Sequence, residues 1–133
     1  MADTRTRPLS PHLTIWKWGP HMAVSILNRA MGVGLATVGT LALVGWLMAL
    51  ASGPEAYASF MGCVKNSYYL GYVVAIGITF AFFFHLCAGL RHFVMDAGAG
   101  FELHANRLWS WMTLFAAVVL TAGTWVIVLG KSF

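Results

Sequence analysis

The sequence predicts an all-α membrane protein with three transmembrane helices. Apolar residues make up 59% of its 133 residues and charged residues only 9%, whereas about a quarter of the residues in a soluble domain are usually charged. Charged side chains are absent from three long stretches, residues 30–54, 66–90 and 108–130. Each stretch exceeds the roughly 20 residues of a membrane-spanning helix, and a lone strand could not satisfy its backbone hydrogen bonds in lipid.

The three stretches divide a single membrane domain into helices and connections. The first helix is expected to begin upstream of its charge-free stretch, because residues 22–27 are also mostly apolar. The expected order is a cytoplasmic or interfacial N-terminal segment, a first helix, an outer loop, a second helix, an inner loop and a third helix, at residues 1–20, 21–52, 53–65, 66–95, 96–107 and 108–130.

The eight basic residues form no cluster typical of a nucleic-acid partner, but they indicate how the chain crosses the membrane. Most of them lie on the side of the N-terminus and of residues 96–107, and only Lys65 and Lys131 lie on the other side. Basic loops usually face the cytoplasm, so we expect a cytoplasmic N-terminus, or one in the matrix of an organelle. The N-terminal residues lack the early apolar region of a secretory signal and are few for a transit peptide. A bacterial inner membrane is therefore favoured over a mitochondrial one.

Three polar side chains are expected at membrane depth: Ser25, Arg29 and His85. Polar and ionisable groups in lipid are costly, which makes these residues functional candidates. His85 lies about 10 Å from the middle of its charge-free stretch toward the inner face, and Arg29 about two turns into the first helix from the same face. The two side chains can therefore share one layer. Ser25 and Arg29 are four residues apart and share a face of their helix.

The helix face that carries His85 also carries Ala81, Gly89 and His92 at intervals of three or four residues. Small residues on either side of His85 leave room for a neighbouring helix or for a flat porphyrin. From spacing alone, ligation of a haem iron and a hydrogen bond to a neighbouring helix explain His85 equally well. His92 cannot be the opposite axial ligand, because it lies about 10 Å away along nearly the same face. A second ligand would therefore come from a partner subunit.

The other polar residues have simpler explanations. Arg29 is explained by a side chain that extends to the lipid headgroups, and Ser25 by a hydrogen bond to its own helix. Interfacial positions explain a further set: His12, His21, Arg91, His92 and His104. The residues alone therefore leave a haem-free helical membrane interaction or anchor protein as an alternative. A small transporter is less favoured, because it would need an acidic residue in mid-membrane, and Glu55, Asp96 and Glu102 lie at or beyond the helix ends.

Two sequence motifs resemble those of a known family. Residues 7–32, RPLSPHLTIWKWGPHMAVSILNRAMG, resemble the N-terminal signature of the cytochrome b subunit of succinate dehydrogenase of the mitochondrial and alphaproteobacterial type. A second family motif, H-x-x-x-G-x-R-H-x-x-x-D, is matched in full from His85 to Asp96. With the three-helix layout, the resemblance covers essentially the whole chain. Two positions depart from the family pattern, because Asn28 replaces the usual histidine and Met31 the usual threonine or serine.

The resemblance implies roles for individual residues. His85 would be an axial ligand of haem b, and Ser25 and Arg29 would face ubiquinone. Arg29 is also expected to pair with a haem propionate, and Asn28 and His92 are candidate propionate contacts. A hydroxyl and a guanidinium suit a quinone, because they donate hydrogen bonds to its carbonyl oxygens and stabilise the negative charge that develops there. Asn28 can donate a hydrogen bond but cannot carry the positive charge of the usual histidine.

The resemblance also implies a function, that of the membrane-anchor cytochrome b subunit of succinate dehydrogenase. The chain would be part of an enzyme but hold no succinate-oxidising site, since it has no flavin motif and no cysteine spacing typical of a cluster. The expected partners are a flavoprotein with FAD, an iron–sulfur protein with its clusters, a second small hydrophobic anchor that shares the haem, and the lipid bilayer. Electrons from succinate would pass through the flavin and the iron–sulfur centres to ubiquinone near the inner face.

Overall fold

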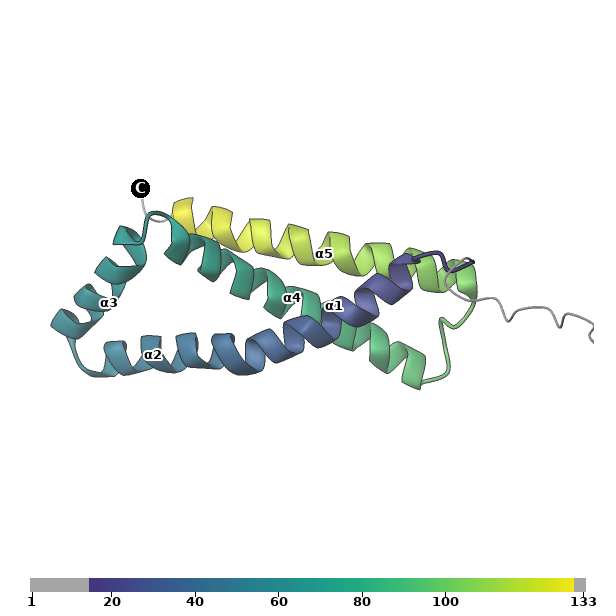
Figure 1. The fold of residues 1–133 in the computed structure, drawn as a ribbon, viewed down its shortest axis with the longest axis horizontal. Coiled ribbons are helices and arrows are strands. Elements are labelled where there is room, and N and C mark those ends of the chain that lie inside the picture. The colour runs from purple at the N-terminus through teal and green to yellow at the C-terminus, as the bar shows by residue number, and fades with distance from the viewer. Residues whose placement is uncertain (1–14, 131–133) are drawn as a thin grey trace, which may run out of the picture.

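The computed structural model describes residues 15–130, and every regular element among them is a helix. In chain order the elements are α1 (Pro20–Gly34), η1 (Leu35–Gly39), α2 (Thr40–Ala51), α3 (Pro54–Asn66), α4 (Leu70–Asp96) and α5 (Leu103–Gly130). Figure 1 shows an elongated arrangement in which α4 and α5 run along the long axis and the corner between α2 and α3 extends beyond their left-hand ends. The predicted N-terminal segment, residues 1–20, lies largely outside the described residues.

Three helices are long and apolar enough to cross a membrane: Pro20–Ala51, Leu70–Asp96 and Leu103–Gly130. The first of these consists of α1, η1 and α2, which follow one another without a break. Even the 27 residues of α4 extend about 40 Å at a rise of about 1.5 Å per residue, and the hydrocarbon core is only about 30 Å thick. The predicted all-α membrane fold with three spans is confirmed. The direction in which the chain crosses the membrane stays a prediction.

The connection between the first two spans is mostly helical, although the sequence suggested a loop at residues 53–65. Its helix, α3, begins at Pro54, whose fixed φ suits the first helical position. Gly53 precedes it with a φ of 103°, a conformation that glycine adopts without strain. Tyr68 and Tyr69, with φ values of 48° and 66°, then lead the chain into α4. The Gly-Pro pair therefore starts a helix as well as ending the preceding one.

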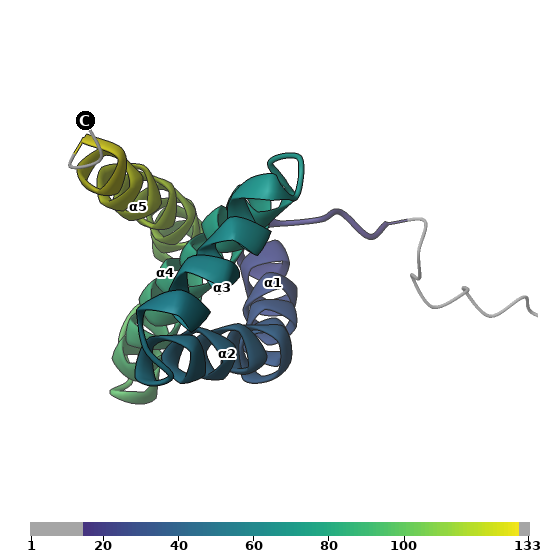
Figure 2. The ribbon, with the colours of Figure 1, turned by 90° about the vertical axis from the view of Figure 1, so that its left-hand side faces the viewer.

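The first span contains one wide helical turn at η1. The backbone N–H of Thr40 bonds there to the carbonyl of Leu35, five residues earlier, which is the hydrogen bond of a π-helix. The hydroxyl of Thr37 also donates to the Val33 carbonyl at 2.8 Å, and bonds of this kind often bend helices. Past this turn the chain changes direction: α1 packs against α4 and α5, whereas α2 contacts only η1 and α3 among the described elements (Figure 1 and Figure 2).

The buried core lies where α1, α4 and α5 meet. Its apolar members are Val24, Phe84, Ala88 and Ala117, of which Phe84 and Ala117 are fully buried. On the same side α5 carries three buried hydroxyl residues, Ser110, Thr113 and Thr121. Each hydroxyl donates to the carbonyl four residues earlier in α5, which satisfies it without a partner from another helix. Small side chains at this spacing let α4 and α5 approach each other closely.

Most of the apolar surface of the three spans is left uncovered by the other described residues. In the most apolar part of the first span only 6% of the residues are buried, against 17% in each of the other two spans. Large apolar side chains such as Val33, Leu41 and Phe115 are more than half exposed. An apolar surface of this extent indicates contact with lipid or with another membrane subunit, and the first span offers the largest share of it.

Candidate functional site

His85 connects the second span to the first. Its neighbour Phe84 is buried in the core, but the His85 side chain itself is exposed. The Nδ1–H of His85 donates to the backbone carbonyl of Asn28 in α1, with 3.3 Å between nitrogen and oxygen. Because a carbonyl oxygen can only accept, this hydrogen bond requires the proton on Nδ1. The lone pair of Nε2 is then available to bind a metal ion.

A glycine of α1 leaves room for the imidazole. A Cβ atom at Gly32 would lie 3.0 Å from Cε1 and 3.4 Å from Nδ1 of His85, closer than the roughly 3.5–4.0 Å at which carbon atoms pack best. The two small residues one turn before and after His85 on α4 differ in how much space surrounds them. Ala81 is buried inside the bundle, whereas a Cβ at Gly89 would meet nothing within 4 Å. The free space that the sequence predicted next to His85 therefore lies on the Gly89 side.

A cavity of about 630 Å³ lies between α1, the C-terminal part of α4 and the start of α5. We call it the basic cavity. Four predicted site residues line it: Ser25, Asn28, Arg29 and His92. His85 is not among its lining residues, but Ala88, one turn further along α4, is. The volume falls within the range of about 300–1,000 Å³ that is typical of small-molecule sites, so the structure gathers these α1 and α4 residues around a space of useful size.

Two arginines, Arg29 and Arg91, bring positive charge to the basic cavity. His21 and His92 also line it, and none of its lining residues is Asp or Glu. Positive groups in a medium of low dielectric constant attract anionic or electron-rich oxygen atoms strongly. The Oδ1 atom of Asn28 and the Nδ1 atom of His21 are also buried without a hydrogen-bond partner among the described residues. The cavity therefore offers positive charge to a ligand.

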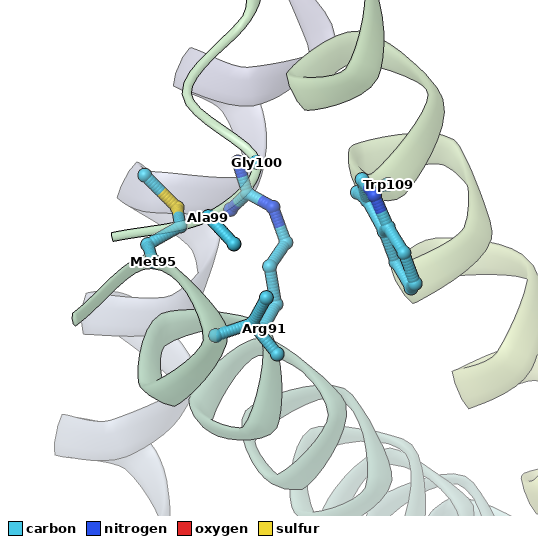
Figure 3. A pocket seen from close by; sticks show the side chains of 6 residues that line it. Arg91, Met95, Ala99, Gly100 and Trp109 are labelled. Atoms are coloured by element: carbon cyan, nitrogen blue, oxygen red, sulfur yellow. The ribbon is translucent and has the colours of Figure 1, made fainter. Parts of the chain in front are cut away.

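Arg91 and Asn106 join α4 to α5 at the basic cavity. The Arg91 guanidinium donates to Oδ1 of Asn106, and both residues line the cavity. Figure 3 shows Arg91 between Met95 of α4 and Trp109 of α5, beside a second and much smaller pocket. That pocket measures about 20 Å³, which is room for little more than a water molecule. Of the two neighbouring spaces, only the basic cavity can hold a cofactor or substrate.

Sequence reasoning did not single out three residues of the basic cavity: His21, Arg91 and Asn106. Interfacial positions explained His21 and Arg91 well enough, and a polar residue near a helix start, such as Asn106, is too common to carry a signal. The one available signal was the match of Arg91 to the second motif. Depth in the membrane cannot show that a side chain turns inward toward a neighbouring helix.

Comparisons with known proteins agree with this architecture. The family described as succinate dehydrogenase/fumarate reductase transmembrane subunit matches residues 3–124. The chain belongs to this family. The succinate dehydrogenase cytochrome b556 subunits of Paracoccus denitrificans and Rickettsia felis are 34% and 32% identical to it, over 96% and 90% of this chain and 97% and 91% of theirs. The mitochondrial cytochrome b560 subunit of Mus musculus is 35% identical over 86% of this chain and 64% of its own length.

Membership of the succinate dehydrogenase/fumarate reductase family confirms the resemblance that the two motifs indicated. As a transmembrane subunit of this family, the chain is one part of a larger oxidoreductase. The relatives are cytochromes by name, and the surroundings of His85 fit a haem in three respects. The imidazole is exposed with its Nδ1–H already paired, the space beside Gly89 is open, and a positively charged cavity that suits carboxylates lies nearby on the same two helices.

His85 is the candidate iron ligand among the described residues. Among residues 15–130, no group of three His, Cys, Asp or Glu side chains is placed to hold a metal ion. A haem iron needs only one axial ligand on each side of the ring, so one histidine is enough for one side. That the ligand on the opposite side comes from another chain stays a prediction.

Proposed function

We propose that this chain is the cytochrome b anchor subunit of a succinate dehydrogenase, in which His85 is an axial ligand of haem b and the basic cavity receives ubiquinone. The observation that supports ligation most strongly is the hydrogen bond from His85 Nδ1–H to the Asn28 carbonyl. Histidines that bind metals usually donate their other ring N–H to a carbonyl, a carboxylate or water. The bond therefore selects the tautomer that ligation through Nε2 requires.

The haem would be shared with a second small hydrophobic anchor subunit. His85 is exposed on the surface of this chain, and a ligand from each subunit would stabilise their association. When bound, haem supplies a one-electron redox centre. Arg29, Asn28 and His92 would hold its propionates, because they line one cavity and offer positive charge and hydrogen-bond donors to carboxylates.

Ser25 and Arg29 would bind the quinone head group. They are one helical turn apart on α1 and both line the basic cavity. The Ser25 hydroxyl and the Arg29 guanidinium can donate to a quinone carbonyl oxygen. As electrons arrive, negative charge grows on that oxygen, and donors that are already oriented toward it stabilise the charge without reorganising. Ubiquinone takes up two electrons and two protons in total and leaves as ubiquinol.

The electrons would come from succinate through partner subunits. FAD in a flavoprotein would accept them, and the clusters of an iron–sulfur protein would carry them to the basic cavity. This chain would anchor those subunits to a bacterial inner membrane and orient the quinone. The predicted cytoplasmic position of the N-terminus and of residues 96–107 agrees with this arrangement. The basic cavity is lined from the start of α1, the end of α4 and the start of α5, and these helix ends lie together at that end of the spans (Figure 1).

An optical spectrum of the assembled complex tests the proposal. We expect the reduced-minus-oxidised spectrum of the purified complex to show a b-type haem band, and His85→Ala to abolish it. His104→Ala is a matched control, because His104 is exposed on α5 outside the basic cavity, and it should keep the full band. An unchanged band in His85→Ala would overturn ligation by this residue.

The second candidate function, a haem-free helical anchor, has one observation in its favour. The same hydrogen bond between His85 and Asn28 joins α4 to α1, and such bonds between membrane helices can hold a bundle together. If the purified complex had no haem band but lost the packing of its helices on His85→Ala, this function would replace the first. The presence of the band in the unaltered complex decides between them.

A further inference from the structure

We infer that the Asn28 main-chain carbonyl and Gly32 together position the His85 imidazole. The carbonyl fixes the ring tautomer, and the missing side chain of Gly32 leaves the space in which the ring can reach that carbonyl. The inference rests on the proposed ligation of haem by His85. It adds two positioning elements on α1 to a ligand on α4.

The geometry of the hydrogen bond sets the chemistry of the ring. With 3.3 Å between Nδ1 and the Asn28 oxygen, only the tautomer that is protonated on Nδ1 makes the bond. A helix carbonyl has a second lone pair, so it can accept from His85 while still serving its own helix. When its Nδ1–H donates a hydrogen bond to a carbonyl, the imidazole becomes a more basic ligand through Nε2. A ligand that gives more electron density to the iron favours the oxidised over the reduced state.

Gly32 controls whether the ring can make this bond. It lies one turn beyond Asn28 on α1, and a Cβ there would lie 3.0 Å from Cε1 and 3.4 Å from Nδ1 of His85. The ring would have to move away from α1 by a few tenths of an ångström to relieve this contact, which lengthens a hydrogen bond that already measures 3.3 Å. Ser25 and Arg29 belong to the same stretch of α1, so one short helical segment orients the imidazole and lines the basic cavity. A shift of this segment would therefore affect both places.

The pair Gly32→Ala and Gly34→Ala tests the steric part. Both substitutions add one methyl group to the same helix and alter its propensity equally, but a Cβ at Gly34 meets nothing within 4 Å. In the assembled complex we expect Gly32→Ala to weaken haem retention by about 10-fold or more and to move the haem midpoint potential in the positive direction. Gly34→Ala should leave both unchanged. If the two variants behaved alike, the positioning role of Gly32 would be refuted.

Ligand replacement tests the hydrogen bond even where Gly32→Ala prevents assembly. In His85→Gly, added imidazole should restore the b-type band, and 1-methylimidazole should do so with a more positive midpoint potential, because its second nitrogen has no proton to donate. Equal potentials with the two ligands would overturn the role of the Asn28 carbonyl while leaving ligation intact. A full band in His85→Gly without any added ligand would instead overturn the proposed function itself.

Discussion

The two ends of the helical bundle each contain a large cavity, but only one of them has the chemistry of a site. The basic cavity, of about 630 Å³, has two arginines, two histidines, a serine and two asparagines among its lining residues. The cavity at the other end, between α2, α3, α4 and α5, is larger, about 870 Å³, and Lys65 is its one charged lining residue. Volume alone would therefore select the other end. Ionisable side chains held at membrane depth are the better guide, because lipid makes them costly to keep there.

The first span shows the same contrast along a single helix. Before the η1 turn it packs on α4 and α5 and carries Ser25, Asn28 and Arg29. After that turn, α2 moves away from both helices and carries almost only apolar side chains. Packing against two helices brings polar groups together and lets them be satisfied, whereas a span that faces lipid has no partner for them.

Removal of the cavity's donors should have the largest effect on turnover. We expect Arg29→Leu to slow ubiquinone reduction by about 100-fold, the typical effect of losing a donor to developing negative charge. Ser25→Ala should slow it by about 10-fold or less, because a neutral hydrogen bond contributes less than a charged one. Succinate oxidation by a soluble artificial acceptor, measured on the same membranes, should stay near its original rate.

Arg107→Leu is the control for Arg29→Leu, since Arg107 is an exposed arginine of α5 outside the basic cavity. It should preserve both activities. Equal loss of the quinone and artificial-acceptor activities in Arg29→Leu would point to failed assembly and would contradict a quinone role for this residue.

An intermediate effect is expected where α4 joins α5. Arg91→Met keeps the length of the side chain but removes its hydrogen bond to Asn106, which should lower the stability of the complex by about 2 kcal/mol, because the donor is charged. Thermal unfolding followed by loss of the haem band would measure this, with Arg107→Met as the comparison. Equal unfolding temperatures for the two variants would mean that the Arg91–Asn106 hydrogen bond does not stabilise the packing of α4 against α5.

The smallest effect on stability and turnover is expected in the larger cavity between α2, α3, α4 and α5. Trp125 lines it, and its Nε1–H is buried without a hydrogen-bond partner among the described residues. Trp125→Phe removes that unpaired donor while keeping an aromatic ring, so stability should change little or rise slightly. The rate of ubiquinone reduction should stay within about 2-fold of the original. A change of about 2-fold corresponds to less free energy than one hydrogen bond contributes, and this variant removes no hydrogen bond. A loss comparable to that of Arg29→Leu would move the quinone site to this end of the molecule.

The sequence predicted the parts of this structure that depend on composition and on helical spacing. Charge-free stretches indicated the three spans because lipid excludes unpaired charge, and the four-residue interval predicted that Ser25 and Arg29 share a face. Arg29 and His85 were expected to share one layer, and His85 does bond to the main-chain carbonyl of Asn28, the residue before Arg29.

Other features depend on interactions that no sequence pattern marks. At the η1 turn the backbone N–H groups bond to carbonyls five residues back instead of four, and the same amino acids can form either kind of bond. The bond of His85 uses a main-chain carbonyl, and every residue has one. The inward position of Arg91 depends on how α5 packs against α4, so depth in the membrane could not distinguish it from an arginine that extends to the headgroups.

A density map of the assembled complex tests the central claim most directly. The account predicts that His85 bonds iron through Nε2, that its Nδ1–H remains on the Asn28 carbonyl, and that the opposite ligand belongs to a second membrane subunit. A map in which His85 touches only that carbonyl or lipid, with no macrocycle beside it, would contradict the account.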